Sequence, residues 1–378
     1  MCFICDRIRM IKNGTNPYFV KELETGYVVI GDNQHFKGYS LFLCKEHKTE
    51  LFQLDYSKKM KFLEEMSIVA EAVSKAFDAE KMNYELLGNG DTHLHWHLFP
   101  RRSGDIENYG NNGKGPVWWY PMEKMYSDDN RPSNVELEAM RSKLLEELEK
   151  IEYSQVQNIA KNTIEFVKDN IYAGMTLPEI RKMCETKMIE LGADSFWYWD
   201  VGAFIFAGDE TKLSVSGKEY ITSKRIIAEN DIITIDLSPQ NGDTWGDYAR
   251  TLIIENGKVV ENDSVSNDEW KKGLLMEEYL HEAMCKFVTP KTTFEELYYY
   301  INSIIEEKGY VNLDFLGNLG HSIVRQKSDR VYIEKGNQIS LGDVSYFTFE
   351  PHISLRDSNF GFKRENIYYF DNGVVKEL

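Results

Sequence analysis

Alternating hydrophobic and polar positions near the start of the chain predict a sheet covered by one helix. Between residues 16 and 47, apolar residues recur at every second position between glycines, as is typical of short antiparallel strands. Residues 56–79 carry apolar side chains at helical spacing with charges between them, so one amphipathic helix is expected there. A further strand pair is expected at residues 83–87 and 92–99.

A run of acidic and polar residues at 128–133 interrupts this pattern. Ser133 is suited to cap a charged helix from about Val135 to Ile151. We place a domain boundary near Glu152 and expect a second helix at residues 154–171. Beyond it we expect helices at 177–191, 268–287 and 292–308, and strands at 198–207, 231–238, 245–254, 344–349 and 365–370, with one more near Ser322. This mixture predicts the α+β class without internal repeats.

Length and charge narrow the function. A chain of 378 residues is longer than a single hydrophobic core usually grows, so two domains are expected. The net charge of −17 argues against nucleic acid or an anionic membrane as a partner, because those need clustered Lys and Arg. The chain has no long apolar run and does not start with a basic segment followed by an apolar one. We therefore expect a cytoplasmic protein.

Three histidines at alternate positions are the strongest chemical signal in the first domain. Successive side chains of a strand point to opposite faces, so His93, His95 and His97 are expected on one face. The chain has only eight histidines, and three of them fall in this run of five residues. Chance surface histidines seldom give such a pattern, so a site built from imidazoles is favoured.

The run from Leu87 to Arg101 resembles the signature of the histidine-triad (HIT) family. The resemblance extends over residues 1–127, with 128–152 as a linker and helix, and implies the HIT fold of an antiparallel sheet with helices. It also implies cleavage or transfer at a nucleotidyl phosphoanhydride or phosphoramidate, with a small nucleotide or nucleotidyl conjugate as partner. HIT proteins are commonly homodimers.

The same resemblance implies a role for each residue of the nucleotide site. His95 is expected to attack the α-phosphorus, and His97 to bind the phosphate oxygens. Asp32 is assigned to the ribose hydroxyls and Asn83 to the phosphate side. Both alignments need a one-residue gap, so Asp32 and Asn83 have an alternative as turn or strand-end residues.

Two thiols three residues apart add a second signal. Cys2 and Cys5 can chelate a tetrahedral zinc ion if two more ligands approach. The HIT resemblance supplies His47 and His93, which makes this a structural zinc site. The alternatives are two reduced, unoccupied cysteines or a redox role, and the redox role is disfavoured because no helix N-terminus or basic neighbour is expected beside the thiols.

A hairpin in the second domain brings two acids together. Asn241-Gly242 is a strong turn signal between two apolar runs, and a two-residue turn there pairs Gln240 with Asp243. Counting outward places Asp236 directly opposite Asp247, and two adjacent carboxylates repel unless a cation lies between them. The buried character of the strand disfavours two acids on a solvated face, so a metal site is predicted.

Three later segments, around His321, Glu350 and Glu365, complete a pattern that resembles the methionine aminopeptidase and Xaa-Pro peptidase family, with its pita-bread fold. The resemblance covers residues 153–378. It implies two divalent ions (Mn, Co, Fe or Zn) on one set of five ligands: Asp236, Asp247, His321, Glu350 and Glu365. It also implies amide cleavage of a short peptide or amino-acid amide by a metal-activated water, with Glu350 as the proton carrier.

Two helper histidines of that family are missing. No histidine lies between Asp200 and Asp236, and position 328, seven residues after His321, is a serine. His352 is expected to make a local hydrogen bond. The leading hypothesis is a bifunctional hydrolase with catalytic residues His95, His97 and Glu350. The alternative keeps the second domain as a non-catalytic binding or assembly module.

Overall fold

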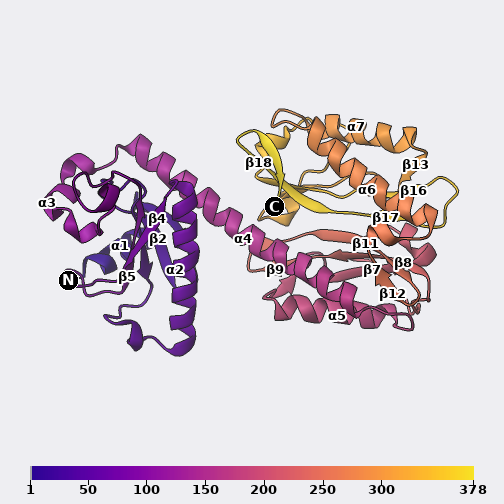
Figure 1. Ribbon diagram of the computed structural model, residues 1–378, viewed down its shortest axis with the longest axis horizontal. Helices are drawn as coiled ribbons and strands as arrows, with labels where there is room; N and C mark the ends of the chain where they lie inside the picture. Colours follow the sequence, from indigo (N-terminus) through magenta and orange to yellow (C-terminus); the bar gives the residue numbers. More distant parts are fainter. Residues whose placement is uncertain (1) are drawn as a thin grey trace. The chain divides into compact units, whose positions relative to one another are not determined.

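The computed structural model describes residues 2–378 and divides into two compact units, one ending at Glu152 and the other beginning at Tyr153. Figure 1 shows a sheet with helices in each unit. Among the described residues, no helix is both long and apolar enough to cross a membrane.

The N-terminal unit is built on one antiparallel sheet in the order β1-β2-β3-β5-β4. Its strands are β1 (Phe19–Glu22), β2 (Gly26–Ile30), β3 (Ser40–Cys44), β4 (Lys81–Glu85) and β5 (His95–Arg101). The helix α2 (Tyr56–Ala76) packs on the sheet, with Phe62 and Val73 fully buried in the shared core. The sheet and its covering helix are therefore confirmed.

Two short helices of this unit were not expected from the sequence. The helix α1 (Phe3–Lys12) buries Ile4 and Ile8 against Tyr27 of β2. The helix α3 (Met122–Met125) follows a loop rich in glycine and asparagine. The apolar positions of α1 are few and interrupted by charges, so helical periodicity was weak there.

A single long helix, α4 (Asn134–Asn170), replaces the two helices expected at its position. The sequence between them contains no glycine or proline that would break a helix, so the backbone continues through Glu152. Ser133 caps α4 as expected, because its hydroxyl oxygen accepts a hydrogen bond from the Glu136 backbone N–H (3.3 Å), and the Glu136 side chain accepts one in return from the Ser133 backbone N–H (2.9 Å).

The C-terminal unit places paired sheets between layers of helices (Figure 1). Its helices are α5 (Leu177–Glu190), α6 (Asp268–Phe287) and α7 (Phe294–Glu307). The first half contains β6 (Ser195–Phe196), β7 (Ala203–Ala207), β8 (Asp231–Leu237), β9 (Pro239–Asn241), β10 (Thr244–Trp245), β11 (Tyr248–Glu255) and β12 (Lys258–Val260). The second half contains β13 (Tyr310–Asn312), β14 (Ser322–Ile323), β15 (Tyr346–Phe349), β16 (His352–Leu355), β17 (Phe362–Lys363), β18 (Asn366–Asp371) and β19 (Val374–Glu377).

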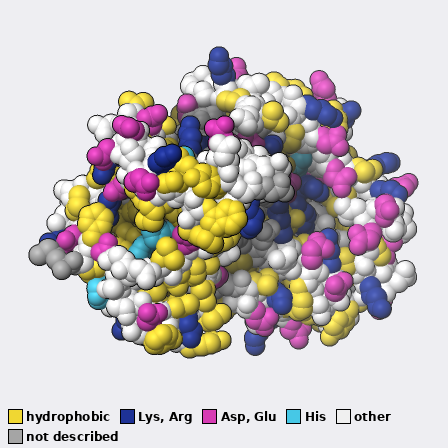
Figure 2. Space-filling model, turned by 60° about the vertical axis from the view of Figure 1, so that its left-hand side comes forward, with side chains coloured by type: hydrophobic (Ala, Val, Ile, Leu, Met, Phe, Trp, Pro, Cys, Tyr) yellow, Lys and Arg dark blue, Asp and Glu magenta, His cyan; other side chains and the backbone are white. Residues whose placement is uncertain are grey.

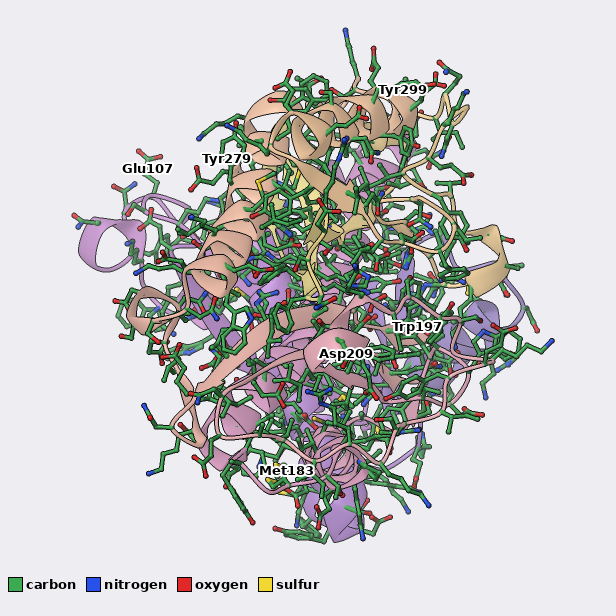
Figure 3. The ribbon with its side chains drawn as sticks, turned by 90° about the vertical axis from the view of Figure 1, so that its right-hand side faces the viewer. Glu107, Met183, Trp197, Asp209, Tyr279 and Tyr299 are labelled. Carbon is green, nitrogen blue, oxygen red and sulfur yellow. The ribbon has the colours of Figure 1, made fainter. Side chains whose placement is uncertain are left out.

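Two hydrophobic cores hold these layers together. Residues of α5 and of the last part of α4 pack on the sheet β12-β11-β8-β7, and α6 and α7 pack on the sheets that contain β15 and β16. Tyr279 and Tyr299 lie on the half-exposed outer surface of α6 and α7 (Figure 3). The expected α+β class and pita-bread fold are confirmed.

The hairpin that carries the two aspartates has a different register from the expected one. Asn241 pairs with Thr244, so the turn lies one residue later than expected, and Asp236 faces Ala249. Asp247 lies two residues before Ala249. The expected direct pairing of the two aspartates is therefore wrong, although both still belong to one face of the sheet.

The turn residue Gly242 explains this shift. Its φ is +58°, a left-handed conformation that glycine adopts without strain. Glycine with a positive φ at the first of two central positions matches a type II′ turn, whereas the sequence analysis assumed a turn centred on Asn241-Gly242.

Candidate functional sites

The three histidines of the N-terminal unit do not share one strand face. The strand β5 begins at His95, and His93 precedes it. His93 Nε2 donates a hydrogen bond to the Cys44 carbonyl (2.8 Å), which turns its Nδ1 toward two cysteines. The expectation of three aligned imidazoles is therefore wrong for His93, while His95 and His97 stay on one face of β5.

His93 joins the cluster that the sequence analysis assigned to zinc. Its Nδ1 lies 3.4 Å from Cys5 Sγ, 3.6 Å from Cys2 Sγ and 3.2 Å from His47 Nδ1, and Cys5 Sγ lies 3.2 Å from the same His47 atom. All four ligand atoms lie within 4.8 Å of one another. Two thiols and two imidazoles are the donor set of a closed zinc site, so the residues fit one ion.

The thiols lie at a helix N-terminus, which the sequence analysis did not expect. Cys2 is the N-cap residue of α1, and its sulfur accepts a hydrogen bond from the Cys5 backbone N–H (3.4 Å). Burial and the neighbouring Cys2 nevertheless raise the pKa of the Cys5 thiol. A raised pKa disfavours a reactive thiolate in the absence of metal, so the redox alternative stays disfavoured for this different reason.

His95 is held in one orientation beside a cavity. Its Nδ1–H donates to the His93 carbonyl (2.6 Å), which leaves Nε2 with the free lone pair. Burial lowers the pKa of His95, so its imidazole is neutral near pH 7. A neutral ring with one fixed N–H and one free nitrogen is arranged as a nucleophile.

His97 is the second imidazole of this cavity and contacts Tyr39. Its Nδ1 lies 2.5 Å from the Tyr39 hydroxyl. Burial, and then the nearby His95, lower the pKa of His97 to about 3. If Tyr39 donates to Nδ1, the N–H at Nε2 is free to donate to an anionic oxygen in the cavity. Sequence analysis did not identify Tyr39, because a tyrosine in a strand is more often part of the core.

Asp32 and Asn83 are placed differently with respect to this cavity. Asp32 lines it together with His95 and His97 and forms an ion pair with Arg7. Asn83 does not line it, and its side-chain oxygen accepts a hydrogen bond from the Arg101 guanidinium (2.8 Å). Asp32 thus lies where the predicted ribose site would be, whereas the Asn83 side chain lies outside the cavity and binds Arg101.

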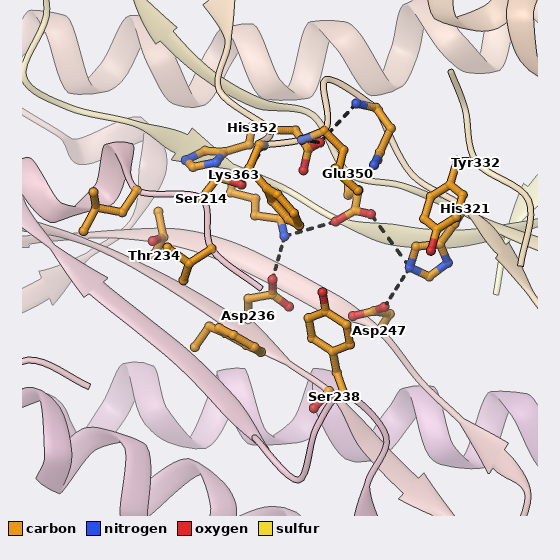
Figure 4. A pocket seen from close by; sticks show the side chains of 18 of the residues that line it. Ser214, Thr234, Asp236, Ser238, Asp247, His321, Tyr332, Glu350, His352 and Lys363 are labelled. Carbon is orange, nitrogen blue, oxygen red and sulfur yellow. Dashed lines mark hydrogen bonds and ion pairs between the residues drawn. The ribbon is translucent and has the colours of Figure 1, made fainter. Parts of the chain in front are cut away.

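Three of the five expected metal ligands of the C-terminal unit converge. Ligand atoms of Asp247, His321 and Glu365 all lie within 4.8 Å of one another. Nδ1–H of His321 donates to the Ser322 carbonyl (3.1 Å), so Nε2 points at Asp247 Oδ2, 3.5 Å away (Figure 4). Both carboxylate oxygens of Glu365 are buried and have no hydrogen-bond partner among the described residues. A bound cation would satisfy both oxygens, and two carboxylates with one imidazole are a suitable donor set, so these residues fit one divalent ion.

The other two expected ligands, Asp236 and Glu350, hold a lysine. Lys363 Nζ lies 2.6 Å from Asp236 Oδ2 and 3.1 Å from Glu350 Oε2 (Figure 4). Sequence analysis did not assign Lys363 to the site. A signal was present, because Lys363 lies two residues before Glu365, and alternate residues of an extended segment share a face.

Burial and mutual repulsion shift the pKa values of these groups. Burial raises the pKa of Asp236 and the nearby Lys363 lowers it, and because burial has the larger effect the pKa is raised overall. Burial raises the pKa of Asp247 to about 6, and burial and then Asp247 raise that of Glu365. Burial alone would raise the pKa of Glu350 as well, but Lys363 and His321 outweigh it and lower the value. The ammonium therefore keeps Glu350 ionised.

Among the described residues, the two helper histidines of the family are absent from this cavity, and aromatic and basic side chains line it. Ser328 is exposed and does not line the cavity, whereas Arg330 does, stacked over the Trp197 ring at 4.8 Å. His352 lines it too, and its Nε2 donates the expected local hydrogen bond, to the Thr211 carbonyl (2.7 Å). Burial, and then Lys363, lower the pKa of His352 to about 4, so it is a neutral group.

Fold and sites together define a pita-bread metal site joined to a histidine-triad domain. The model of the HIT domain matches residues 18–104, and the model of metallopeptidase family M24 matches residues 152–372. Since the second match covers more than half of the chain, this protein belongs to metallopeptidase family M24 and carries a HIT domain. Both family resemblances drawn from the sequence are confirmed.

Solved structures resemble the C-terminal part of the chain. Prolidase from Pyrococcus furiosus matches with a TM-score of 0.51 and 20% identity over 61% of this chain and 63% of that protein. Prolidase from Thermococcus sibiricus matches with a TM-score of 0.51 and 20% identity over 66% and 68%. The chain spans 58% of X-Pro aminopeptidase from Thermotoga maritima, at 22% identity and a TM-score of 0.49. No curated protein matches the chain. Likeness at these identities establishes the fold.

Proposed function

We propose that the N-terminal unit cleaves a nucleotidyl phosphoanhydride or phosphoramidate through a nucleotidyl-histidine at His95. The observation that carries this proposal is the hydrogen bond from His95 Nδ1–H to the His93 carbonyl, which leaves Nε2 free beside the cavity. Cys2, Cys5, His47 and His93 would hold a structural zinc ion, and because His93 is itself one of these residues, the ion would fix the carbonyl that orients His95.

The reaction follows from these positions. The lone pair of His95 Nε2 forms a bond to the α-phosphorus, and the bond from phosphorus to the leaving oxygen or nitrogen breaks with its electron pair. His97 Nε2–H donates to a non-bridging phosphate oxygen, where negative charge grows in the transition state. Water then attacks the same phosphorus and loses a proton to solvent, and the phosphorus–nitrogen bond breaks with its electron pair returning to His95 Nε2. The nucleoside monophosphate leaves, and the released proton balances the one that the leaving oxygen or nitrogen takes up. Asp32 accepts hydrogen bonds from the ribose hydroxyls.

The test is to trap the covalent intermediate. The protein is mixed with an adenosine phosphoramidate, quenched in acid-free denaturant within one turnover and digested. Mass spectrometry is expected to find one nucleotidyl group on the peptide that contains His95. The His95→Ala variant should lack it, while His281→Ala, a buried histidine of the other unit, should retain it. Equal labelling of His95→Ala and the wild type would contradict the proposal.

For the C-terminal unit we propose a metal-dependent hydrolase of short peptides or amino-acid amides. Asp247, His321 and Glu365 would hold a divalent ion of the Mn, Co, Fe or Zn group, which lowers the pKa of a bound water so that it can attack a carbonyl. Glu350 lies 3.9 Å from His321 Nε2 and is kept ionised, so it can take a proton from that water and pass it to the leaving amine. The Arg330 guanidinium in the cavity can bind a substrate carboxylate.

One observation favours a second candidate, a binding module without peptidase activity. Lys363 forms ion pairs with two of the five family ligands, Asp236 and Glu350. A screen of dipeptides, including Xaa-Pro, and of amino-acid amides in the presence of Mn²⁺ separates the candidates. The hydrolase predicts release of free amino acid that is lost in Asp247→Ala. If the wild type and Asp247→Ala bind the same compounds with equal affinity and neither hydrolyses them, the binding module is supported instead.

A further inference from the structure

The position of Lys363 bears on how many metal ions the C-terminal site can bind. The five carboxylate and imidazole side chains divide into two sets. Asp247, His321 and Glu365 bring three ligand atoms within 4.8 Å of one another. Asp236 and Glu350 do not belong to that group and face the Lys363 ammonium, at 2.6 and 3.1 Å, although Glu350 also lies 3.9 Å from His321 Nε2.

We propose that this site binds one divalent ion, on Asp247, His321 and Glu365, and that the Lys363 ammonium takes the place of a second. The inference rests on the proposed function only in requiring that the unit bind metal at all. It replaces the expectation of two ions, drawn from family resemblance, with a metal ion and a built-in organic cation.

Charge balance supports a single ion. The four carboxylates of the site would carry at most four negative charges, when all of them are ionised, and Lys363 and one divalent ion together bring three positive charges. A second divalent ion would make the cluster net positive in a buried place, next to an ammonium that repels it. Without Lys363, two divalent ions would balance the four carboxylates.

The backbone around Lys363 prevents its simple withdrawal. Its N–H donates to Thr251 Oγ1 (2.8 Å), and its carbonyl accepts from the same hydroxyl (3.0 Å), which ties it to β11. Lys363 also pairs with His352 in the β16–β17 ladder. The side chain is only 18% exposed, so leaving the two carboxylates would strand a mostly buried ammonium.

A single ion changes how the site can act. In a site with two ions, one ion can activate the attacking water while the other polarises the substrate carbonyl as a Lewis acid. With one ion, Lys363 would supply the second positive charge, held beside Asp236 and Glu350 at a fixed place, and would polarise a substrate oxygen by donating a hydrogen bond. The site would then favour a substrate that carries an anionic or strongly polar oxygen next to the reacting carbonyl.

Titration of the full chain with Mn²⁺, followed by electron paramagnetic resonance, tests the proposal. Mn²⁺ prefers oxygen ligands, so it reports on the carboxylate site rather than on the thiol cluster. The wild type is expected to bind one equivalent of Mn²⁺ with the spectrum of an isolated ion. Lys363→Met is expected to bind two equivalents with the broadened spectrum of a spin-coupled pair.

Matched variants make the outcome decisive. Lys363→Arg keeps the charge and is expected to stay at one equivalent, and so is Lys327→Met, which removes a lysine bound to the Trp197 carbonyl and Gln240. Two coupled ions in the wild type would overturn the inference while leaving the proposed hydrolase intact. One ion in folded Lys363→Met would also overturn it. If neither the wild type nor any variant bound Mn²⁺, or if Asp247→Ala bound as much Mn²⁺ as the wild type, the metal-dependent function itself would be contradicted.

Discussion

The two sites of this protein are built in opposite ways. The N-terminal site takes His93, His95 and His97 from five consecutive residues, and burial keeps these rings neutral. The C-terminal site gathers acids and one histidine from separate strands and loops, and its carboxylates repel one another unless cations enter. One site therefore relies on local geometry and uncharged groups, and the other on long-range packing and charge compensation.

The difference extends to the surroundings of the sites. In the N-terminal unit, side chains of α1 and β2 wall the cavity. Figure 2 shows hydrophobic and charged side chains mixed over the face that it presents. In the C-terminal unit, a buried lysine lies among the acids. The comparison predicts that single substitutions act on chemistry in the first site and on cation binding in the second.

The largest expected effect is on nucleotidyl transfer. His95→Ala should reduce kcat for AMP release from an adenosine phosphoramidate by at least about 10⁴-fold, because it removes the nucleophile. His97→Ala, which removes one donor to the phosphate, should cost roughly 10²- to 10³-fold. Asp247→Ala should leave the rate unchanged. A rate in His95→Ala close to that of wild type would place the nucleophile elsewhere.

Loss of zinc should come next. Cys2→Ser/Cys5→Ser removes two ligands. A metal ion whose Kd is about 1,000-fold below the free zinc concentration stabilises the folded unit by about 4 kcal/mol. The melting temperature of the N-terminal unit should fall by roughly 10 °C. Differential scanning calorimetry with and without a chelator measures it, and Cys44→Ser is the control outside the cluster. A transition insensitive to both chelator and substitution would show that the four residues hold no metal.

The backbone beside His321 offers a smaller test in the C-terminal unit. Gly320 has a φ of +136°, and a Cβ there would lie 2.3 Å from the Thr348 carbonyl oxygen. Gly320→Ala should destabilise the unit by about 2 kcal/mol through strain and weaken Mn²⁺ binding by displacing His321. Gly336→Ala is matched, because Gly336 also has a positive φ (+90°) but no atom within 4 Å of the new Cβ. Equal loss of Mn²⁺ affinity in both variants would contradict this explanation.

The pH dependence should show the smallest effect. A histidine that must be neutral loses activity as the pH falls through its pKa in the folded protein. Burial lowers the pKa of His95, and that of His97 to about 3, so kcat/KM should stay flat through about 6.5, where a free imidazole titrates. A profile that halves at that value would show that these rings are not shielded from water.

Much of the fold was predictable because hydrophobic periodicity reports local structure. The sheet and helix of the first domain, the α+β class and both families followed from the sequence. The wrong predictions of helices arose where the hydrophobic periodicity was too weak to show where a helix begins or ends. Two helices were expected on either side of a domain boundary near Glu152, where α4 is continuous, and the helix α1 is too short and too polar to stand out.

The candidate sites divide in the same way. Spacing identified the histidine run and the thiol pair, because these residues lie two or three positions apart, and the HIT resemblance then implied their roles. The register of the β8–β11 hairpin could not be read, because one residue of shift in the turn preserves the face and changes the partner. Tyr39 and Lys363 were missed, since their partners are distant in the chain.

The sequence by itself determined which chemical groups this protein owns: a histidine run, a thiol pair and an ordered set of metal-type ligands. Only the tertiary structure decided which of those groups face each other. It brought the Tyr39 hydroxyl to His97, and it set Lys363 between Asp236 and Glu350. The reason is physical, because covalent spacing fixes neighbours only within a strand or helix, whereas charge compensation depends on segments that packing alone brings together.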